Sequence, residues 1–484
     1  MANNCKKFGQ FPNRVTYQEL RHQHRADAQA LLPEYVERLS WSAAQLAQER
    51  QTHLRQLVQV AQACSPWHRQ RLAAIDPQRL TEESLRHVPP MTKADLMANW
   101  DDITTVPDLS LDLVEAHLQT VETDRYLLAQ YHAVASGGSS GQRGVFVYDW
   151  QGWMRVYLTM ARWVAQKRPA SNGQTPVHAL LVADRATHIS SAYIQTFMDG
   201  SAFHRIPVTR PIGQIVDQLN RLQPTTLGGY PSALHLLVPQ ARAGRLQIAP
   251  DWIGTGAEPL LPETRAALEE TWGVPVGNVW GCSEGARAMS CGQGRGMHLC
   301  DDLVIVEPVD QQGQPVPPGV PAAKVYLTNL FNHALPLIRY ELSDELTFLD
   351  EPCPCGSAHR RIDDIQGRVD DLFDYENGVQ VHPHLFRSVL GRQQNIIEYQ
   401  VRQTERGAAI AIHCAGAVDT AALSREIAAG LSAAGLDGPE VAIRQVKRLD
   451  RLGTGKLKRF VPLQATTPPA QTRSIVHTRQ TATN

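Results

Sequence analysis

Short apolar strands, glycine turns and amphipathic helices alternate between residues 176 and 282, and this alternation constrains the fold more than any other feature. Strand-like segments occupy residues 177–183, 225–229, 252–256 and 274–280, and helical spacing covers 212–222, 232–242 and 262–272. Such a succession predicts an α/β protein with a mostly parallel sheet covered by helices. Ligands of these folds bind at the carboxyl ends of the strands, where the glycine-rich turns of this segment fall.

Other patterns flank this region. Residues 34 to about 75 have helical spacing, with Pro66 ending the run. After residue 323 the pattern becomes strand-like over 324–329, 334–340 and 345–349. A short α+β pattern follows, with strands at 396–403, 408–414 and 441–449 and a helix at 420–433. We place a domain boundary near 368–371 and expect a disordered Thr/Pro/Gln/Arg-rich tail over 466–484.

The charge balance narrows the classes of partner. Lys plus Arg number 47 and Asp plus Glu number 48, which gives a net charge of −1. Proteins that bind phosphate backbones usually carry a basic excess, so nucleic acid is not expected as a partner. No stretch has the length and apolarity of a membrane span, and Met1–Lys7 leads into no signal-peptide core. We expect a cytoplasmic protein with no membrane partner.

Residues Ala135–Gly144 form a glycine- and serine-rich segment, ASGGSSGQRG. Its backbone amides and hydroxyls can cradle phosphate oxygens. The strict P-loop pattern is not met, because no Lys-Ser or Lys-Thr follows the last glycine. A flexible linker is equally compatible with the segment alone, although the apolar run Val145–Tyr148 argues against it.

Four further segments carry candidate chemistry. Trp280–Gly285 ends a predicted strand, where Glu284 can hold Mg²⁺ beside a phosphate or simply face solvent. In Leu335–Asp344, Arg339 and Asp344 can bind phosphate and sugar, but on their own we expect them to pair with each other. Gly367–Asp371 is the third segment. Arg451–Arg459 presents Lys456 after a Gly-Thr-Gly turn, as a mobile cation or as part of a basic surface loop.

Taken in order, these segments resemble the acyl-adenylate-forming (acyl-CoA synthetase) superfamily, and within it the phenylacetate–CoA ligase branch. The resemblance runs from about residue 55 to 463. It includes Ser65–Arg69, Val88–Leu96, Gly229–Ser232 and Gly254–Pro259. It implies a large N-terminal adenylation domain over 1–369, a small mobile α+β lid domain over 370–465, and a hinge at Asp370.

The resemblance also implies roles for individual residues. Lys456, Glu284 and Arg368 would be catalytic, with Glu284 holding Mg²⁺, and Tyr230 would line the acid pocket. One departure from the family lies in the glycine- and serine-rich segment, the expected phosphate loop. The family usually has Lys after its last glycine, and this chain has Gln142 there. Arg143 is expected to supply the positive charge, and pyrophosphate binding is the step that this departure affects. The expected ATP-binding residues are Ser139, Ser140, Gly141, Arg143, Gly256, Ala257, Glu258, Pro259, Trp280, Gly281, Cys282, Ser283, Asp344 and Arg368.

The implied reaction uses ATP to convert a carboxylic acid, aryl or otherwise compact, into an acyl-adenylate with release of pyrophosphate. Transfer to the thiol of CoA would then give acyl-CoA and AMP. Two alternatives remain: transfer to an amine or a carrier-protein thiol, and a non-catalytic nucleotide- or acyl-binding homologue. Dimers are common in the branch, so a homodimer is expected.

Five of the eight cysteines crowd between residues 282 and 355. Cys353 and Cys355 form a CPCG turn, and Cys291 and His298 lie upstream. Thiolates and imidazoles are zinc ligands, and four of them make a closed structural site. The resemblance strengthens this prediction, because the branch often has Cys and His before a later CPCG. We expect structural zinc on Cys291, His298, Cys353 and Cys355, with Cys300 in reserve, in an insert over about 282–355; reduced, partly buried thiols are the alternative.

Overall fold

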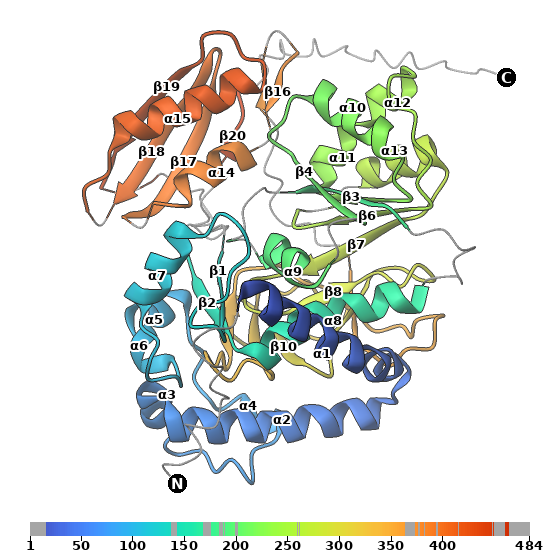
Figure 1. Ribbon diagram of the computed structural model, residues 1–484. Coiled ribbons are helices and arrows are strands. Elements are labelled where there is room, and N and C mark those ends of the chain that lie inside the picture. The colour runs from blue at the N-terminus through green and yellow to red at the C-terminus, as the bar shows by residue number, and fades with distance from the viewer. Residues whose placement is uncertain are drawn as a thin grey trace, which may run out of the picture.

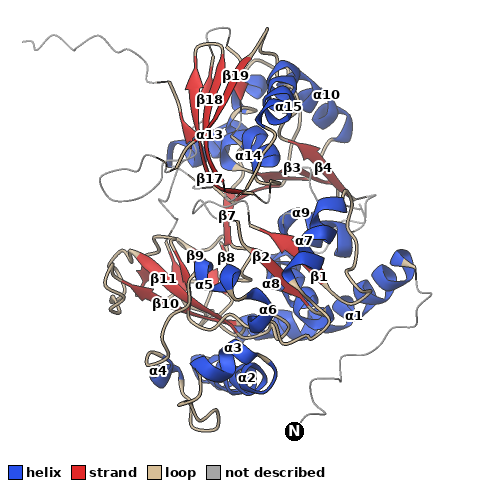
Figure 2. Ribbon diagram, turned by 90° about the vertical axis from the view of Figure 1, so that its left-hand side faces the viewer, coloured by secondary structure: helices blue, strands red, loops and turns tan. Residues whose placement is uncertain are grey.

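A computed structural model of the chain describes residues 16–136, 143–167, 176–182, 187, 189–198, 202–258, 260, 262–363, 373–375, 378–381, 383–393, 395–414, 416–447, 449 and 460–463. Its centre is a nine-stranded sheet in the order β13-β14-β9-β8-β7-β6-β5-β3-β4 (Figures 1 and 2). The strands are β3 (His178–Val182), β4 (Phe203–Pro207), β5 (Thr226–Gly229), β6 (Trp252–Gly256), β7 (Val276–Gly281), β8 (Arg287–Met289), β9 (Met297–Leu299), β13 (Phe348–Leu349) and β14 (Arg361–Ile362).

The predicted parallel sheet is confirmed for β4, β3, β5, β6 and β7, which pair in parallel. The other four strands extend it with antiparallel pairs. Figure 1 shows helices gathered beside the parallel part. They are α10 (Ile212–Leu222), α11 (Pro231–His235), α12 (Val238–Arg242) and α13 (Pro262–Trp272). The predicted helix over 232–242 is therefore interrupted. Pro239 has no amide hydrogen to continue α11, and it lies instead in the first turn of α12, where proline is tolerated.

The N-terminal helices surround the lower part of the molecule in Figure 1: the second and fourth lie along the bottom, the fifth to seventh at the left, and the first beside α8 (Trp150–Lys167). They are α1 (Tyr17–Glu37), the 3₁₀ turn η1 (Arg38–Ser40), α2 (Ala43–Cys64), α3 (Pro66–Arg71), α4 (Glu82–Leu85), α5 (Lys93–Ala98), α6 (Trp100–Ile103) and α7 (Leu111–Thr120). The single run expected over 34–75 is wrong in its bounds. Thr16 and Ser42 each form a capping box, so one helix starts earlier and a second starts after the turn.

Two antiparallel sheets complete this part of the chain. β1 (His132–Ala135) pairs with β2 (Val145–Tyr148), and α8 (Trp150–Lys167) and α9 (Ile189–Phe197) pack nearby. β10 (Val304–Val309), β11 (Lys324–Asn329) and β12 (Tyr340–Leu342) form the other sheet. The strand expected over 334–340 does not form. The carbonyl of Ala334 instead accepts from the amide of Thr105, and the carbonyl of Pro336 meets the ring of His68.

The last part has its own core, centred on Phe373, Phe386 and Phe460. Its sheet has the order β19-β18-β17-β20, with two helices packed on it (Figure 2). The elements are β15 (Phe373–Asp374), β16 (Gln380–Val381), α14 (His384–Leu390), β17 (Ile396–Thr404), β18 (Gly407–Cys414), α15 (Thr420–Ala433), β19 (Glu440–Gln445) and β20 (Phe460–Val461). The α+β pattern agrees with this unit. The proposed boundary and tail lie outside the described residues.

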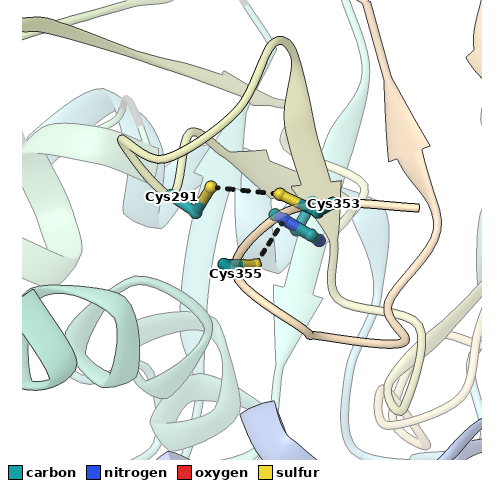
Figure 3. Close-up of side chains that lie close together, drawn as sticks. Cys291, Cys353 and Cys355 are labelled. Carbon is teal, nitrogen blue, oxygen red and sulfur yellow. Dashed lines mark hydrogen bonds between the residues drawn. The ribbon is translucent and has the colours of Figure 1, made fainter. Parts of the chain in front are cut away.

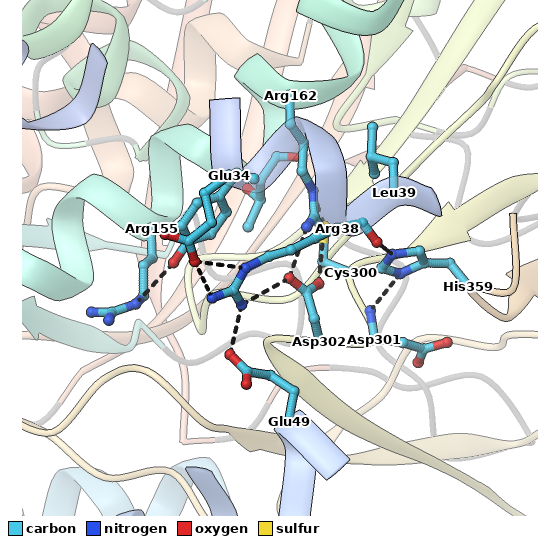
Figure 4. Close-up of polar contacts among 12 residues, drawn as sticks. Glu34, Arg38, Leu39, Glu49, Arg155, Arg162, Cys300, Asp301, Asp302 and His359 are labelled. Carbon is cyan, nitrogen blue, oxygen red and sulfur yellow. Dashed lines mark hydrogen bonds and ion pairs between the residues drawn. The ribbon is translucent and has the colours of Figure 1, made fainter. Parts of the chain in front are cut away.

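Buried charges tie the layers together (Figure 4). The Arg162 guanidinium on α8 donates two hydrogen bonds of 2.8 Å to the Asp302 carboxylate, and neither side chain is exposed. Arg38 approaches the same carboxylate at 3.5 Å and also binds Glu34 and Glu49. Burial alone would raise the pKa of Asp302, but the Arg162 charge outweighs it and lowers the pKa to about 2. Among the described helices, none combines the length and apolarity needed to cross a membrane.

Candidate active site

The carboxyl end of β6 presents the predicted adenine-binding turn. A side chain at Gly256 would bring its Cβ within 3.0 Å of the Val279 carbonyl oxygen, so the backbones approach closely there. Ala257 follows with a φ of 66°, which is unusual for a residue other than glycine, and it is exposed. Glu258 is half-buried, and Pro259 lies outside the described residues. A strained, exposed turn at a strand end is a suitable place for a ligand.

At the end of the neighbouring strand β7, Trp280 meets Asp344, which lies 64 positions further along the chain. The Trp280 indole Nε1 is 3.4 Å from Asp344 Oδ1, and Trp280 is buried while Asp344 is half-buried. Beyond Gly281 the chain turns through Cys282 and Ser283, whose carbonyl oxygen accepts a 2.6 Å hydrogen bond from the Tyr148 hydroxyl. Two of the expected ATP-binding residues, Trp280 and Asp344, are thus side by side.

Glu284 lies at the centre of this group and is 3% exposed. Its Oε1 is 3.9 Å from the Nζ of Lys93, which belongs to α5. Burial raises the pKa of the Glu284 carboxyl, the Lys93 charge lowers it, and the Asp344 charge raises it further. Two backbone hydrogen bonds, Met91 to Arg339 and Glu341 to Met91, hold the segment before Lys93 against β12. Sequence reasoning gave Lys93 no role; its place within Val88–Leu96 was the available signal.

The phosphate loop is described only at its ends. It joins the antiparallel strands β1 and β2, where Ser136 and Gly144 exchange hydrogen bonds of 2.8 Å. Ser139, Ser140 and Gly141 lie outside the described residues, as do Arg368, Asp370 and Lys456. Arg143 is described, and its guanidinium pairs with the Glu115 carboxylate on α7.

Two other sequence interpretations can be compared with the structure. The expected pairing of Arg339 with Asp344 is wrong, because Arg339 Nε donates to Glu307 Oε2 at 3.0 Å and its guanidinium also binds the carbonyls of Arg86 and Val88. Tyr230 follows β5 and packs among the apolar side chains of α11 and α12, with 9% of its surface exposed. Its role in binding the acid remains a prediction.

The four expected zinc ligands come together (Figure 3). One donor atom from each of Cys291, His298, Cys353 and Cys355 lies within 4.8 Å of all the others. The sulfurs of Cys291 and Cys353 are 3.5 Å apart, and Cys355 Sγ is 3.4 Å from His298 Nε2. A tetrahedral site with Zn–S bonds of about 2.3 Å places two sulfurs about 3.8 Å apart, so the spacing fits zinc.

The surroundings of this cluster favour metal binding. His298 Nδ1 lies 3.0 Å from the His359 carbonyl oxygen, which can only accept, so Nδ1 carries the proton and Nε2 is left with its lone pair. Burial would raise the pKa of Cys291, but hydrogen bonds from His298, Gln293 and Cys353 lower it to about 6. The reserve ligand Cys300 lies elsewhere, fully buried, with its thiol 3.7 Å from the Thr159 carbonyl oxygen.

Known proteins resemble this chain partly in sequence and more widely in fold. No family model matches the chain. The chain is 38% identical to a phenylacetate–coenzyme A ligase of Thermus thermophilus over 141 residues, which is 28% of this chain and 31% of the relative. It is 32% identical to the phenylacetate–coenzyme A ligase of Pseudomonas putida over 134 residues, 26% of this chain and 29% of the relative. The matched segments thus span about a third of these relatives.

Solved structures match over far more of the chain. A 2-hydroxyisobutyryl-CoA ligase in complex with its acyl-AMP and CoA superposes with a TM-score of 0.56 at 18% identity. The superposition covers 88% of this chain and 91% of that one. The chain therefore shares the fold of this adenylate-forming ligase. The phenylacetate–coenzyme A ligases are relatives of a part of the chain only.

Proposed function

We propose that this protein activates a carboxylic acid with ATP, forming an acyl-adenylate and pyrophosphate, and then passes the acyl group to CoA. The observation that carries the proposal is the convergence of four separate segments. The turn after β6 lies beside the end of β7, because Gly256 pairs with Val279. Trp280 at that end of β7 meets Asp344, and Glu284 approaches Lys93 of α5. Each segment alone has an ordinary structural explanation, but together they would supply ligands for base, ribose, metal and phosphate.

The first half-reaction requires in-line attack by a substrate carboxylate oxygen on the α-phosphorus, with pyrophosphate leaving. Mg²⁺, when bound, would neutralise charge that develops on the phosphate oxygens. Glu284 is the residue that would hold it. Lys93 would add a cation near the same phosphates, Trp280 and Ala257 would position the base, and Asp344 would bind the ribose hydroxyls. Lys456 and Arg368 remain proposed catalytic residues of the adenylation step.

In the second half-reaction the thiol of CoA attacks the acyl carbonyl, and AMP leaves. Two observations support CoA as the acceptor: the names of the Thermus and Pseudomonas relatives, and the CoA bound in the 2-hydroxyisobutyryl-CoA ligase structure. We propose an aryl or otherwise compact acid, in keeping with the name phenylacetate–coenzyme A ligase of these two relatives. An amine or a carrier-protein thiol is the second candidate acceptor.

We also propose that Cys291, His298, Cys353 and Cys355 hold a structural Zn²⁺. Four protein ligands leave no open position for a substrate, so the metal would stabilise the fold rather than take part in the reaction. It would join the loop between β8 and β9 to the CPCG turn before β14.

The deciding experiment is carboxylate-dependent exchange of labelled pyrophosphate into ATP, with pooled aryl, aliphatic and amino acids. We expect exchange with the wild type and a loss of at least about 100-fold in Glu284→Gln and Lys456→Ala. Glu122→Gln, on an exposed carboxylate, is the matched control and should retain activity.

The acceptor follows from AMP release with and without CoA. A separate reaction with hydroxylamine, which attacks the acyl-adenylate and releases AMP without CoA, reports adenylate formation alone. AMP release that requires CoA supports the ligase, whereas release that requires an added amine supports the second candidate. The proposal fails if calorimetry shows that the wild type binds ATP but none of the acids in the pool supports pyrophosphate exchange. A non-catalytic binding protein is then favoured.

A further inference from the structure

Arg287 on β8 is a buried arginine, and its guanidinium forms no ion pair within the described part of the chain. The residue is 6% exposed. Its side-chain contacts are with Tyr193 of α9: Nη1 is 3.5 Å from the hydroxyl, and the guanidinium carbon is 5.0 Å from the ring centroid. Among the described residues no carboxylate forms an ion pair with it, whereas buried Arg162 and Arg339 have Asp302 and Glu307. A buried charge with no ion-pair partner among the described residues is unfavourable, so an anionic ligand is a suitable partner for it.

The position opposite Arg287 in the sheet is a glycine, which has no side chain to cover the guanidinium. Arg287 is paired with Gly281 across the β7–β8 ladder, and its Nε would be 3.7 Å from a Cβ placed on that glycine. Gly281 is exposed although Trp280 before it is buried, so solvent reaches the sheet at this point. A ligand group that entered here would meet the guanidinium directly.

The strand geometry indicates which substrate would occupy this space. Successive residues of a strand point to opposite faces, so Gly281 and its cross-strand partner Arg287 face away from the side that Trp280 occupies. Trp280 lies against Asp344, the proposed ribose ligand. The nucleotide therefore belongs on the Trp280 face, and Arg287 lies on the other face. The charges of both Arg287 and Glu284 act on the buried hydroxyl of Tyr148, which donates to the Ser283 carbonyl, so Arg287 belongs to the surroundings of the proposed magnesium ligand. The acid must meet the α-phosphate in this region.

We propose that Arg287 and Tyr193 bind an anionic group of the acid at a distance from the carboxylate that is adenylated. The substrate class is then a carboxylic acid with a second anionic group, such as a dicarboxylic acid. This inference rests on the proposed function and refines it. Adenylation removes the charge of the reacting carboxylate, so the second anion is the one that can hold the acid through both half-reactions.

The test uses matched acids in which a terminal methyl is replaced by a carboxylate: butyrate and succinate, valerate and glutarate, p-toluate and terephthalate. Pyrophosphate exchange gives kcat/KM for each acid. We expect the wild type to favour the dicarboxylic member of at least one pair by about 100-fold, because a site built for a charged group rejects its apolar analogue. Arg287→Met should abolish this preference, and Arg287→Lys should keep part of it. Arg242→Met, at an exposed arginine, is the control.

A second variant guards against misfolding of Arg287→Met. Tyr193→Phe keeps the ring and removes the hydroxyl, so it should raise KM for the dicarboxylic acid several-fold and leave KM for ATP unchanged. A wild type that prefers the methyl member of each active pair, or an Arg287→Met enzyme with unchanged preference, would overturn the inference. So would a lack of exchange with all six acids. Exchange with monocarboxylic acids in the wider pool would leave the proposed function intact.

Discussion

Lys93 and Arg143 differ in the carboxylates that they meet. Arg143 is paired with Glu115 on α7, whereas Lys93 approaches Glu284, the proposed magnesium ligand. Because the chain has Gln142 where the related enzymes usually carry lysine, a cation from another segment is needed to neutralise phosphate charge. The position of Lys93 makes it the better candidate, although Arg143 remains a predicted ligand.

We expect Lys93→Met to lower kcat/KM for ATP by about 10- to 100-fold, because it removes a cation next to developing charge. Arg143→Met should act mainly on stability, through the loss of its pair with Glu115. Exchange kinetics at varied ATP, with melting temperatures of both variants, separate these effects. Normal kinetics in Lys93→Met and a large loss in Arg143→Met would reverse the assignment.

At the scale of elements, the Cys/His cluster joins two turns of the chain that are otherwise far apart in sequence. We expect purified protein to contain about one zinc per chain by mass spectrometry. Chelation should lower the melting temperature, and Cys353→Ser and Cys355→Ser should each lose the metal. Cys414→Ser, a free thiol in the last unit, serves as the control. Metal-free protein whose melting temperature is insensitive to both substitutions would refute the zinc site.

The Arg162–Asp302 pair is the second device that joins elements, here α8 and the turn before β10. Arg162→Met leaves a buried carboxylate without its partner, and we expect a loss of about 3–5 kcal/mol in the free energy of unfolding. The double variant Arg162→Met/Asp302→Leu should recover much of that loss, because it removes both members of the buried pair while Arg38 keeps Glu34 and Glu49. Denaturant titration measures both. A single variant within about 1 kcal/mol of the wild type would show that the pair contributes little.

At the scale of the whole molecule, buried histidines make stability depend on pH. Burial lowers the pKa of His24 and His68 to about 3 and of His333 to about 4. Between these values and about 6.5 the unfolded chain binds more protons than the folded one, so stability rises with pH in this window. The contribution of these three histidines to stability is fully present above about pH 6.5 and is lost as the solution is acidified.

The free energy of unfolding should therefore fall by up to about 1.4 kcal/mol per pH unit for each of these groups below pH 6.5. His68→Gln should reduce the slope, because its neutral amide does not titrate. Urea titrations at pH 7, 6 and 5 give the slope directly. A stability that is constant over this range would contradict the proposed burial of neutral rings.

The sequence by itself determined the features that depend on short stretches. The periodicity of 212–222, 252–256 and 420–433 corresponds to α10, β6 and α15, because burial on one face is written into neighbouring positions. The exact ends of helices were harder to predict. Ser42 caps a helix that begins inside the run expected over 34–75, and Pro239 lies in a helix that begins inside the one expected over 232–242. The four zinc-ligand candidates were identified from residue type and resemblance, and the fold brings them within reach.

Only the tertiary structure decided which distant residues meet. Lys93 approaches Glu284 because the segment at Met91 is held against β12, and Trp280 reaches Asp344 across 64 positions. Arg287 stands over Gly281 because β8 returns antiparallel to β7, while α9 brings Tyr193 to the same point. These contacts depend on strand order, register and the face that each side chain occupies, and no local pattern of one sequence specifies those three things together.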